Sequence, residues 1–283
     1  QTTDLGKEKP PRHRNSDQHS VPGTWYERRR WLAPSTASTM RFLEADVGST
    51  PDHDEELRAA IETFWRVRGT QQQKQVEAGT ADAGTRGSVT GGAHMAAIEQ
   101  VVVNLLGEVG LAPDEVRTRT SLELPGYYRS QKKWDLLVIA DKRLIAAVEF
   151  KSQVGAFGNN FNNRSEEAIG NAEDLWTAFR EGRFGQALPP FVGFFFLLEH
   201  ANEVTLSVKN AEPYFKVDPI FIEDGKGVSY ARRYEILLRR LVLERKYTAA
   251  CLALSPKVST GTQATGVWLP SCSCDTADIP PLR

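Results

Sequence analysis

Two acids and one lysine, Asp135, Glu149 and Lys151, are the residues whose types and spacing could support chemistry. Two carboxylates held close together repel each other, and a cation bound between them would turn that repulsion into an attraction. The lysine would add a positive charge beside the same site. The alternative interpretation is a solvated strand end, in which Lys151 simply pairs with one of the acids.

A predicted β-hairpin over residues 134–153 positions all three side chains. Two apolar runs rich in Val, Ile and Leu flank a polar break centred on Lys142, a pattern typical of a hairpin. With Lys142 at the centre of the turn, Asp135 lies opposite Glu149 on the neighbouring strand. Lys151 follows Glu149 by two residues, so its side chain points to the same face of the sheet.

The register of this hairpin decides whether the two acids meet. The same turn places Ala140 opposite Leu144, and a slip of one residue would move one carboxylate to the opposite face. Two ionised carboxylates about 5 Å apart repel by roughly 3 kcal/mol at an effective dielectric of about 20. Such a pair breaks a local rule of sheet stability, and exceptions of this kind usually mark function.

Composition is that of an ordinary soluble globular protein, since 40% of the 283 residues are hydrophobic and 25% are charged. The net charge of −1 neither suggests nor excludes a nucleic-acid partner. No apolar run approaches the roughly 18 residues of a membrane span, so no membrane partner is expected. Three cysteines, an odd number, favour reduced thiols in the cytoplasm, and Cys272-x-Cys274 lacks the spacing of a zinc site.

Residues 1–39 differ from the rest of the chain. They mix Pro, Ser, Thr and Arg without apolar periodicity, and we expect them to be disordered or to lie upstream of a start at Met40. Residues 40–270 have a normal size for one domain, and residues 271–283 form a weakly patterned tail.

Apolar periodicity predicts further elements around the hairpin. Helices are expected at residues 51–68 and 95–109, from Ser165 to Gly182, and at 230–254; strands are expected at 122–128 and 191–198. Residues 69–94, rich in Gly and Gln, are expected to be structureless, either as a linker or as a DNA-contacting segment. The resulting fold class is α/β, with a mixed central sheet flanked by helices on both faces.

Two polar features lie outside the hairpin. Glu99 stands beside the buried face of the helix at 95–109, from which an acid can reach a metal site, although most such residues are simply exposed. The loop expected at 154–164 carries Asn159, Asn160, Asn162, Asn163 and Arg164. Asn can pair with adenine and Arg with guanine, whereas Asn and Gly also favour plain turns. Beside a metal site, DNA contact is the favoured interpretation.

The acid some dozen residues before Glu-x-Lys, on a hairpin in this order of elements, resembles the PD-(D/E)XK nuclease core. Asp135, Glu149 and Lys151 match its residues, and Trp134 stands in place of the motif's proline. Longer segments resemble the XhoI family of type II restriction endonucleases over residues 40–268. They are Gly-Ser-Val-Thr-Gly-Gly at 87–92, Trp-Asp-Leu-Leu-Val at 134–138, Glu-Phe-Lys-Ser-Gln-Val-Gly at 149–155, Phe-Gly-Asn-Asn-Phe-Asn-Asn-Arg at 157–164 and Arg-Tyr-Glu-Ile-Leu-Leu-Arg-Arg-Leu-Val at 233–242.

The resemblance implies a homodimeric, Mg²⁺-dependent endonuclease that cuts double-stranded DNA at the palindrome CTCGAG, with a cognate DNA methyltransferase protecting the host. In such an enzyme Asp135 and Glu149 hold Mg²⁺. Lys151 orients or deprotonates the attacking water and stabilises charge on the phosphate, and Glu99 is an accessory acid. A palindrome suits a twofold dimer, because each subunit reads one half-site. The asparagine-rich segment is the first candidate for reading bases.

Two other functions stay open at this point. A PD-(D/E)XK nuclease of the repair or mobile-element type would share the core but would not require a dimer or a short palindrome. A DNA-binding relative that has lost catalysis would have no need for a repulsive cluster. The presence of Asp135, Glu149 and Lys151 counts against this last function.

Overall fold

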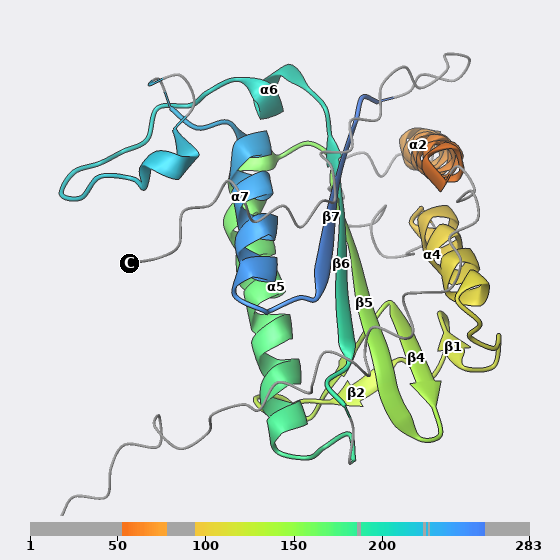
Figure 1. Ribbon diagram of the computed structural model, residues 1–283. Coiled ribbons are helices and arrows are strands. Elements are labelled where there is room, and N and C mark those ends of the chain that lie inside the picture. Colours follow the sequence, from red (N-terminus) through yellow and green to blue (C-terminus); the bar gives the residue numbers. More distant parts are fainter. Residues whose placement is uncertain (1–52, 78–93, 186–187, 223–224, 226, 258–283) are drawn as a thin grey trace, which may run out of the picture. The chain divides into compact units, whose positions relative to one another are not determined.

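The computed structural model describes residues 53–77, 94–185, 188–222, 225 and 227–257, all within one compact unit that spans Asp52–Arg283 (Figure 1). The segment 1–39, the tail 271–283, most of the segment 69–94 and the motif at 87–92 lie outside the described residues. None of the described helices is long and apolar enough to cross a membrane.

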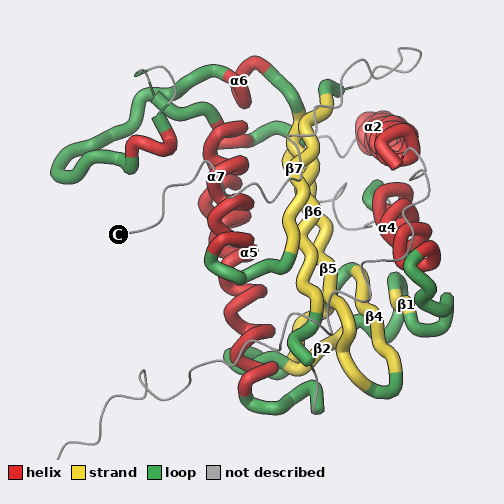
Figure 2. The backbone as a smooth tube through the Cα atoms, in the orientation of Figure 1, coloured by secondary structure: helices red, strands yellow, loops and turns green. Residues whose placement is uncertain are grey.

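A five-stranded mixed sheet is the centre of this unit, with its strands in the order β1-β4-β5-β6-β7 (Figures 1 and 2). They are β1 (Val116–Arg117), β4 (Leu136–Ala140), β5 (Arg143–Gln153), β6 (Phe191–Glu199) and β7 (Ala249–Ser255). β1, β4 and β5 are antiparallel neighbours, whereas β5, β6 and β7 run parallel. A separate antiparallel pair, β2 (Glu123–Pro125) and β3 (Gln131–Lys133), precedes β4.

Helices cover both faces of the sheet, and each face has its own hydrophobic core. α5 (Phe157–Arg180) and α7 (Tyr230–Leu243) pack on one face, and α2 (His53–Glu77) and α4 (Ala96–Glu108) on the other (Figure 1). The short helices α6 (Asn202–Thr205) and η2 (Pro219–Phe221) lie between β6 and α7. The predicted fold class, an α/β protein with a mixed sheet flanked by helices, is therefore confirmed and is consistent with a restriction-endonuclease-like core.

The β4–β5 hairpin differs from its predicted register near the turn and agrees with it at the opposite end. The turn holds two residues, Asp141 and Lys142, with φ angles of 49° and 60°, so Ala140 pairs with Arg143 rather than with Leu144. A β-bulge then adds one residue to β5, and the pairs beyond it follow the predicted register. The two shifts cancel before the strand end that carries the acids.

The helix expected at residues 230–254 is a helix followed by a strand, so that prediction was wrong. α7 ends at Leu243, and the chain returns to the sheet as β7. The segment Ala-Ala-Cys-Leu-Ala-Leu-Ser favours a helix locally, because Ala and Leu are strong helix formers. A parallel strand buried on both faces also has a continuous apolar run, so periodicity did not distinguish the two.

The loop expected at 154–164 is largely the first part of α5, which begins at Phe157. Ser165 is therefore not an N-cap: its hydroxyl donates a hydrogen bond to the Phe161 carbonyl one turn earlier. The reason is tertiary packing. The rings of Phe157 and Phe161 pack against Tyr230 and Tyr234 of α7, with centroids 6.4 and 5.0 Å apart, and this outweighs the turn preference of Asn and Gly.

Two further boundaries differ from expectation. α2 continues past Gly69 to Glu77, because a single glycine costs only about 1 kcal/mol in a helix and the glutamines after it are good helix formers. The strand expected at 122–128 is reduced to β2 and belongs to the small sheet, while β1 forms the edge of the main sheet. The helix ending at Gly182, the helix at 95–109 and the strand at 191–198 are confirmed to within two residues.

Lys142→Gly should stabilise the protein, because glycine adopts a positive φ without the steric cost that lysine carries. We expect the free energy of unfolding, measured by urea denaturation, to rise by about 0.5 kcal/mol. Arg143→Gly, at the first residue of β5, is the matched control and should lower it by a similar amount. Equal destabilisation by both substitutions would contradict the turn geometry.

Candidate active site

Glu149 on β5 is the buried centre of a charged cluster. The residue is 2% exposed, and its carboxylate contacts two ammonium groups: Lys151 Nζ lies against Oε1, and Lys132 Nζ lies 2.6 Å from Oε2. Glu149 and Lys151 share one face of β5, because side chains two residues apart along a strand point the same way. Burial would raise the pKa of Glu149, but Lys151 and Lys132 together hold it below its ordinary value.

Asp135, immediately before β4, is tied directly to β5. Its Oδ2 accepts a hydrogen bond of 2.8 Å from the backbone N–H of Phe150, the neighbour of Glu149. Burial, followed by the charge of Glu149, raises the pKa of Asp135 above its ordinary value. The second of these causes is the repulsion between carboxylates on which the sequence prediction rests. The structure thus brings together Asp135, Glu149 and Lys151.

Lys132 belongs to the same cluster, although the sequence analysis did not single it out. It lies on β3, its side chain is 11% exposed, and its Nζ is 4.3 Å from the ring centroid of Trp134. A signal was present, since two consecutive lysines stand directly before the Trp134-Asp135 motif. Their direction depends on the β2–β3 hairpin, which the sequence pattern did not predict.

The environment of Lys151 keeps its ammonium group charged. Burial alone would lower the pKa of Lys151, but the carboxylate of Glu149, and then those of Asp135 and Glu167, raise it above its ordinary value. A lysine with a raised pKa is a poor base at neutral pH and a good hydrogen-bond donor. Of the two roles considered for Lys151, this arrangement favours orienting water and stabilising charge over deprotonation.

Glu99 on α4 is electrostatically coupled to the cluster. Burial and the charge of Asp135 raise the pKa of Glu99 to about 7, and Arg119 acts in the opposite direction. α4 packs on the face of the sheet opposite to α5. The position of Glu99 is compatible with the accessory role expected for it.

The predicted DNA-reading residues lie in the first turns of α5. Asn162 and Asn163 are exposed, Asn160 is half-buried, and the side chain of Asn159 lies outside the described part of the chain. Arg164 pairs with Glu167, with Nη1 2.7 Å from Oε2. Arg164 is therefore engaged within its own helix, which the sequence did not indicate.

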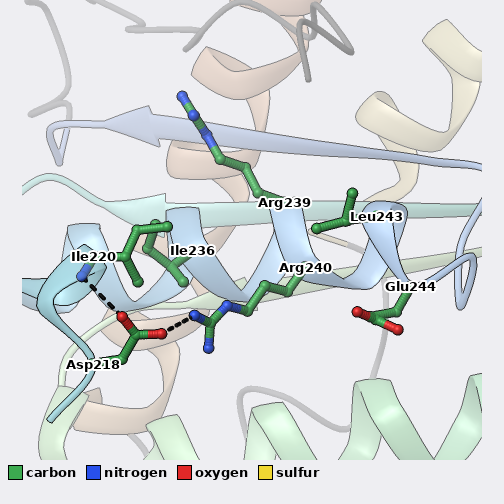
Figure 3. A pocket seen from close by; sticks show the side chains of 7 residues that line it. All are labelled: Asp218, Ile220, Ile236, Arg239, Arg240, Leu243 and Glu244. Carbon is green, nitrogen blue, oxygen red and sulfur yellow. Dashed lines mark hydrogen bonds and ion pairs between the residues drawn. The ribbon is translucent and has the colours of Figure 1, made fainter. Parts of the chain in front are cut away.

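A pocket of about 290 Å³ lies at α7 and η2 rather than at this cluster (Figure 3). Its lining residues are Asp218, Ile220, Ile236, Arg239, Arg240, Leu243 and Glu244. Asp218 accepts a hydrogen bond from the backbone N–H of Ile220 and pairs with Arg240. The charged cluster around Glu149 contributes no side chain to this pocket. The pocket is therefore not the candidate active site.

The donor atoms of the cluster fit a divalent metal ion. Mg²⁺ prefers oxygen ligands and is usually bound through one or two carboxylates together with water and phosphate oxygens. Asp135 and Glu149 supply two carboxylates. Within the described ranges, no group of three or more His, Cys, Asp and Glu side chains could hold a metal ion, so an ion bound here would also need water or phosphate oxygens.

Comparison with known proteins identifies the family. The family model described as "Restriction endonuclease XhoI" matches residues 74–265, more than half of the chain. The chain belongs to the XhoI restriction endonuclease family. The resemblance found in the sequence is therefore confirmed. Type II restriction enzymes are endodeoxyribonucleases, which act on DNA and generally use divalent metal ions.

The matches to three curated relatives cover most of the length of each relative. The type II restriction enzyme BstVI of Geobacillus stearothermophilus is 48% identical over 187 residues, covering 64% of this chain and 82% of that protein. XhoI of Xanthomonas vasicola is 43% identical over 196 residues (68% and 77%). AbrI of Azospirillum brasilense is 47% identical over 167 residues (58% and 75%). No solved structure matches the chain.

Lys132→Met should destabilise the protein, because it leaves one oxygen of a buried carboxylate without its charged partner while keeping most of the apolar stem over Trp134. We expect a loss of about 2 kcal/mol in the free energy of unfolding at neutral pH, measured by urea denaturation. Lys132→Arg retains the charge and serves as the control, with a smaller loss. Unchanged stability of the methionine variant would show that Glu149 does not need Lys132.

Glu99→Gln should flatten the dependence of stability on pH in metal-free protein. Because the pKa of Glu99 is raised to about 7 in the folded state, the folded state holds a proton that the unfolded state releases between about pH 4.5 and 7. Stability from this group is present at low pH and is lost as the pH rises through that window. At pH 8 the variant should be more stable than the wild type, on the order of 1 kcal/mol after solvent screening. Parallel pH profiles from thermal melts in EDTA would contradict this coupling.

Proposed function

We propose that the chain is a type II site-specific endonuclease that hydrolyses double-stranded DNA at a palindrome, CTCGAG, in a Mg²⁺-dependent reaction. The observation that carries the proposal is the meeting of half-buried Asp135 and Lys151 with buried Glu149 in one cluster, in a chain of the XhoI family. The spacing of these residues matches the PD-(D/E)XK motif, in which an acid on one strand and Glu-x-Lys on the next act together.

Each member of the cluster has a distinct task in this proposal. A divalent ion held by Asp135 and Glu149 would supply Lewis-acid polarisation of the phosphoryl oxygen. Lys151 Nζ donates hydrogen bonds to the attacking water and to the phosphate, where it stabilises the developing negative charge. Lys132 keeps the Glu149 carboxylate oriented from the opposite side. All four residues lie on or next to paired strands, so little reorganisation is needed during the reaction.

Base recognition is assigned to the start of α5. Asn162 and Asn163 are exposed and Asn160 is half-buried, so their amide groups can reach base edges in a groove. Asn159 stays a candidate by sequence alone. Arg164 is a weaker candidate, because reading guanine would require it to give up its ion pair with Glu167.

The remaining expectations follow from the proposed reaction. A homodimer would present two equivalent sites to the two halves of a palindrome, and a cognate DNA methyltransferase would protect the host genome. A cytoplasmic location and a single endonuclease domain over residues 40–270 also stay predictions. So does the expectation that residues 1–39 and 271–283 lie outside that domain.

Glu149→Gln should abolish cleavage. The substrate is a pair of plasmids that differ only in one CTCGAG site, incubated with Mg²⁺; the wild type should linearise only the plasmid with the site. Loss of one ligand carboxylate should lower the cleavage rate by about 10³-fold or more. Asp135→Asn provides a second test if Glu149→Gln does not fold, and EDTA should stop the wild-type reaction.

Glu203→Gln, an exposed acid on α6, is the matched control and should cleave like the wild type. Equal cutting of both plasmids would keep the nuclease but remove the CTCGAG assignment. Full activity of folded Glu149→Gln and Asp135→Asn would remove the site assignment. A folded protein that binds DNA without cutting it would identify the chain as a DNA-binding relative without catalysis.

A further inference from the structure

The hairpin between β2 and β3 ends in two exposed aromatic side chains. Tyr127 is 50% exposed and Tyr128 is 69% exposed, and their rings stand edge to face with centroids 4.9 Å apart. Tyrosine combines a large apolar surface with a polar tip, and it is enriched where proteins bind partners. An adjacent pair that remains outside both hydrophobic cores is therefore a candidate contact surface.

A buried acid fixes the backbone of this tip. Asp174 on α5 is 3% exposed; its Oδ1 accepts hydrogen bonds of 2.8 Å from the backbone N–H groups of both Tyr127 and Tyr128. Its Oδ2 pairs with Arg129 Nε at 2.9 Å. Gly126 is tightly enclosed, since a Cβ there would lie 2.6 Å from both Arg129 O and Asp174 Oδ2. A rigid backbone with rings on its outer side lowers the entropic cost of binding.

The same hairpin leads into the candidate active site. Lys132 contacts Glu149, and Tyr128 stands four positions before Lys132 in the chain. At about 3.3 Å per extended residue, the Cα atoms of Tyr128 and Lys132 are at most roughly 13 Å apart. A DNA duplex rises by about 3.4 Å per base pair, so this distance corresponds to about four base pairs. A duplex whose scissile phosphate lies at Glu149 and whose axis follows this hairpin would come within reach of the two rings.

The charged groups around the tip balance one another. Arg129 and the two backbone N–H groups compensate the negative charge of Asp174, and the exposed Lys133 follows on β3 opposite Glu123. The tip thus presents apolar ring faces, and the charge of Asp174 beneath it is compensated. The tip therefore does not repel phosphates.

We infer that Tyr127 and Tyr128 form a DNA contact that packs its ring faces into a groove of the duplex within about four base pairs of the cut. The inference rests on the proposed function, because it takes the substrate duplex as the partner. Aromatic faces add affinity by packing on sugars and bases rather than by reading hydrogen-bonding groups. The contact therefore depends on the rings and not on the hydroxyl groups.

The test compares two double variants of the full chain. Tyr127→Ala with Tyr128→Ala should weaken binding to a CTCGAG duplex about ten-fold, measured by fluorescence anisotropy at fixed salt with Ca²⁺ in place of Mg²⁺. Tyr127→Phe with Tyr128→Phe keeps both rings and should bind within two-fold of the wild type (about 0.4 kcal/mol or less). Tyr214→Ala with Phe215→Ala removes two side chains that are each 88% exposed elsewhere, and it is the matched control with unchanged binding.

Each outcome separates this inference from the proposed function. If the wild type binds and cuts DNA and the alanine variant binds as tightly as the wild type, the tip contact is overturned. The nuclease function then still stands. A tenfold loss in both the alanine and phenylalanine variants overturns the ring-packing mechanism. A dimer that becomes monomeric in the alanine variant, measured by analytical ultracentrifugation, assigns the tip to a subunit interface instead. A wild type that binds no duplex removes the proposed function and the contact together.

Discussion

The burial of the Glu149 carboxylate is the constraint on which the rest of this structure depends. Moving a charge from water into a protein interior costs several kcal/mol unless charged partners compensate it. Here the compensation comes from two different elements, Lys151 on β5 and Lys132 on β3. β5 and the small β2–β3 sheet must therefore be in place together for this carboxylate to stay ionised.

The fold provides a rigid support for that arrangement. β5 pairs with β4 on one side and with β6 on the other, at the point where the sheet changes from antiparallel to parallel. Both of its faces are covered by helices with separate hydrophobic cores. A strand held along both edges and both faces has little freedom to move, which is what the proposed site would require to position a phosphate and a metal ion.

The electrostatic state of the cluster is consistent with binding a cation. Glu149 has a lowered pKa because two lysines surround it, whereas Asp135 and Glu99 both have raised pKa values, through burial and neighbouring acids. Burial and neighbouring acids therefore disfavour the ionised forms of Asp135 and Glu99, and a bound cation would favour them. Membership of the XhoI restriction endonuclease family agrees with this state, since type II restriction enzymes generally use divalent metal ions.

The sequence by itself determined the two acids, the lysine two residues after Glu149 and the hairpin that carries them, because strand alternation and motif spacing are local properties. It also determined the α/β class, through the order of its apolar segments. Only the tertiary structure decided that Lys132 reaches Glu149, that Arg164 pairs with Glu167 and that residues 249–255 form a strand. Periodicity reports that a residue is buried, but the element that buries it can lie far away in the chain. The same limit applies to α5, whose first turns are held by aromatic packing on α7, a contact across some seventy residues that no local preference encodes.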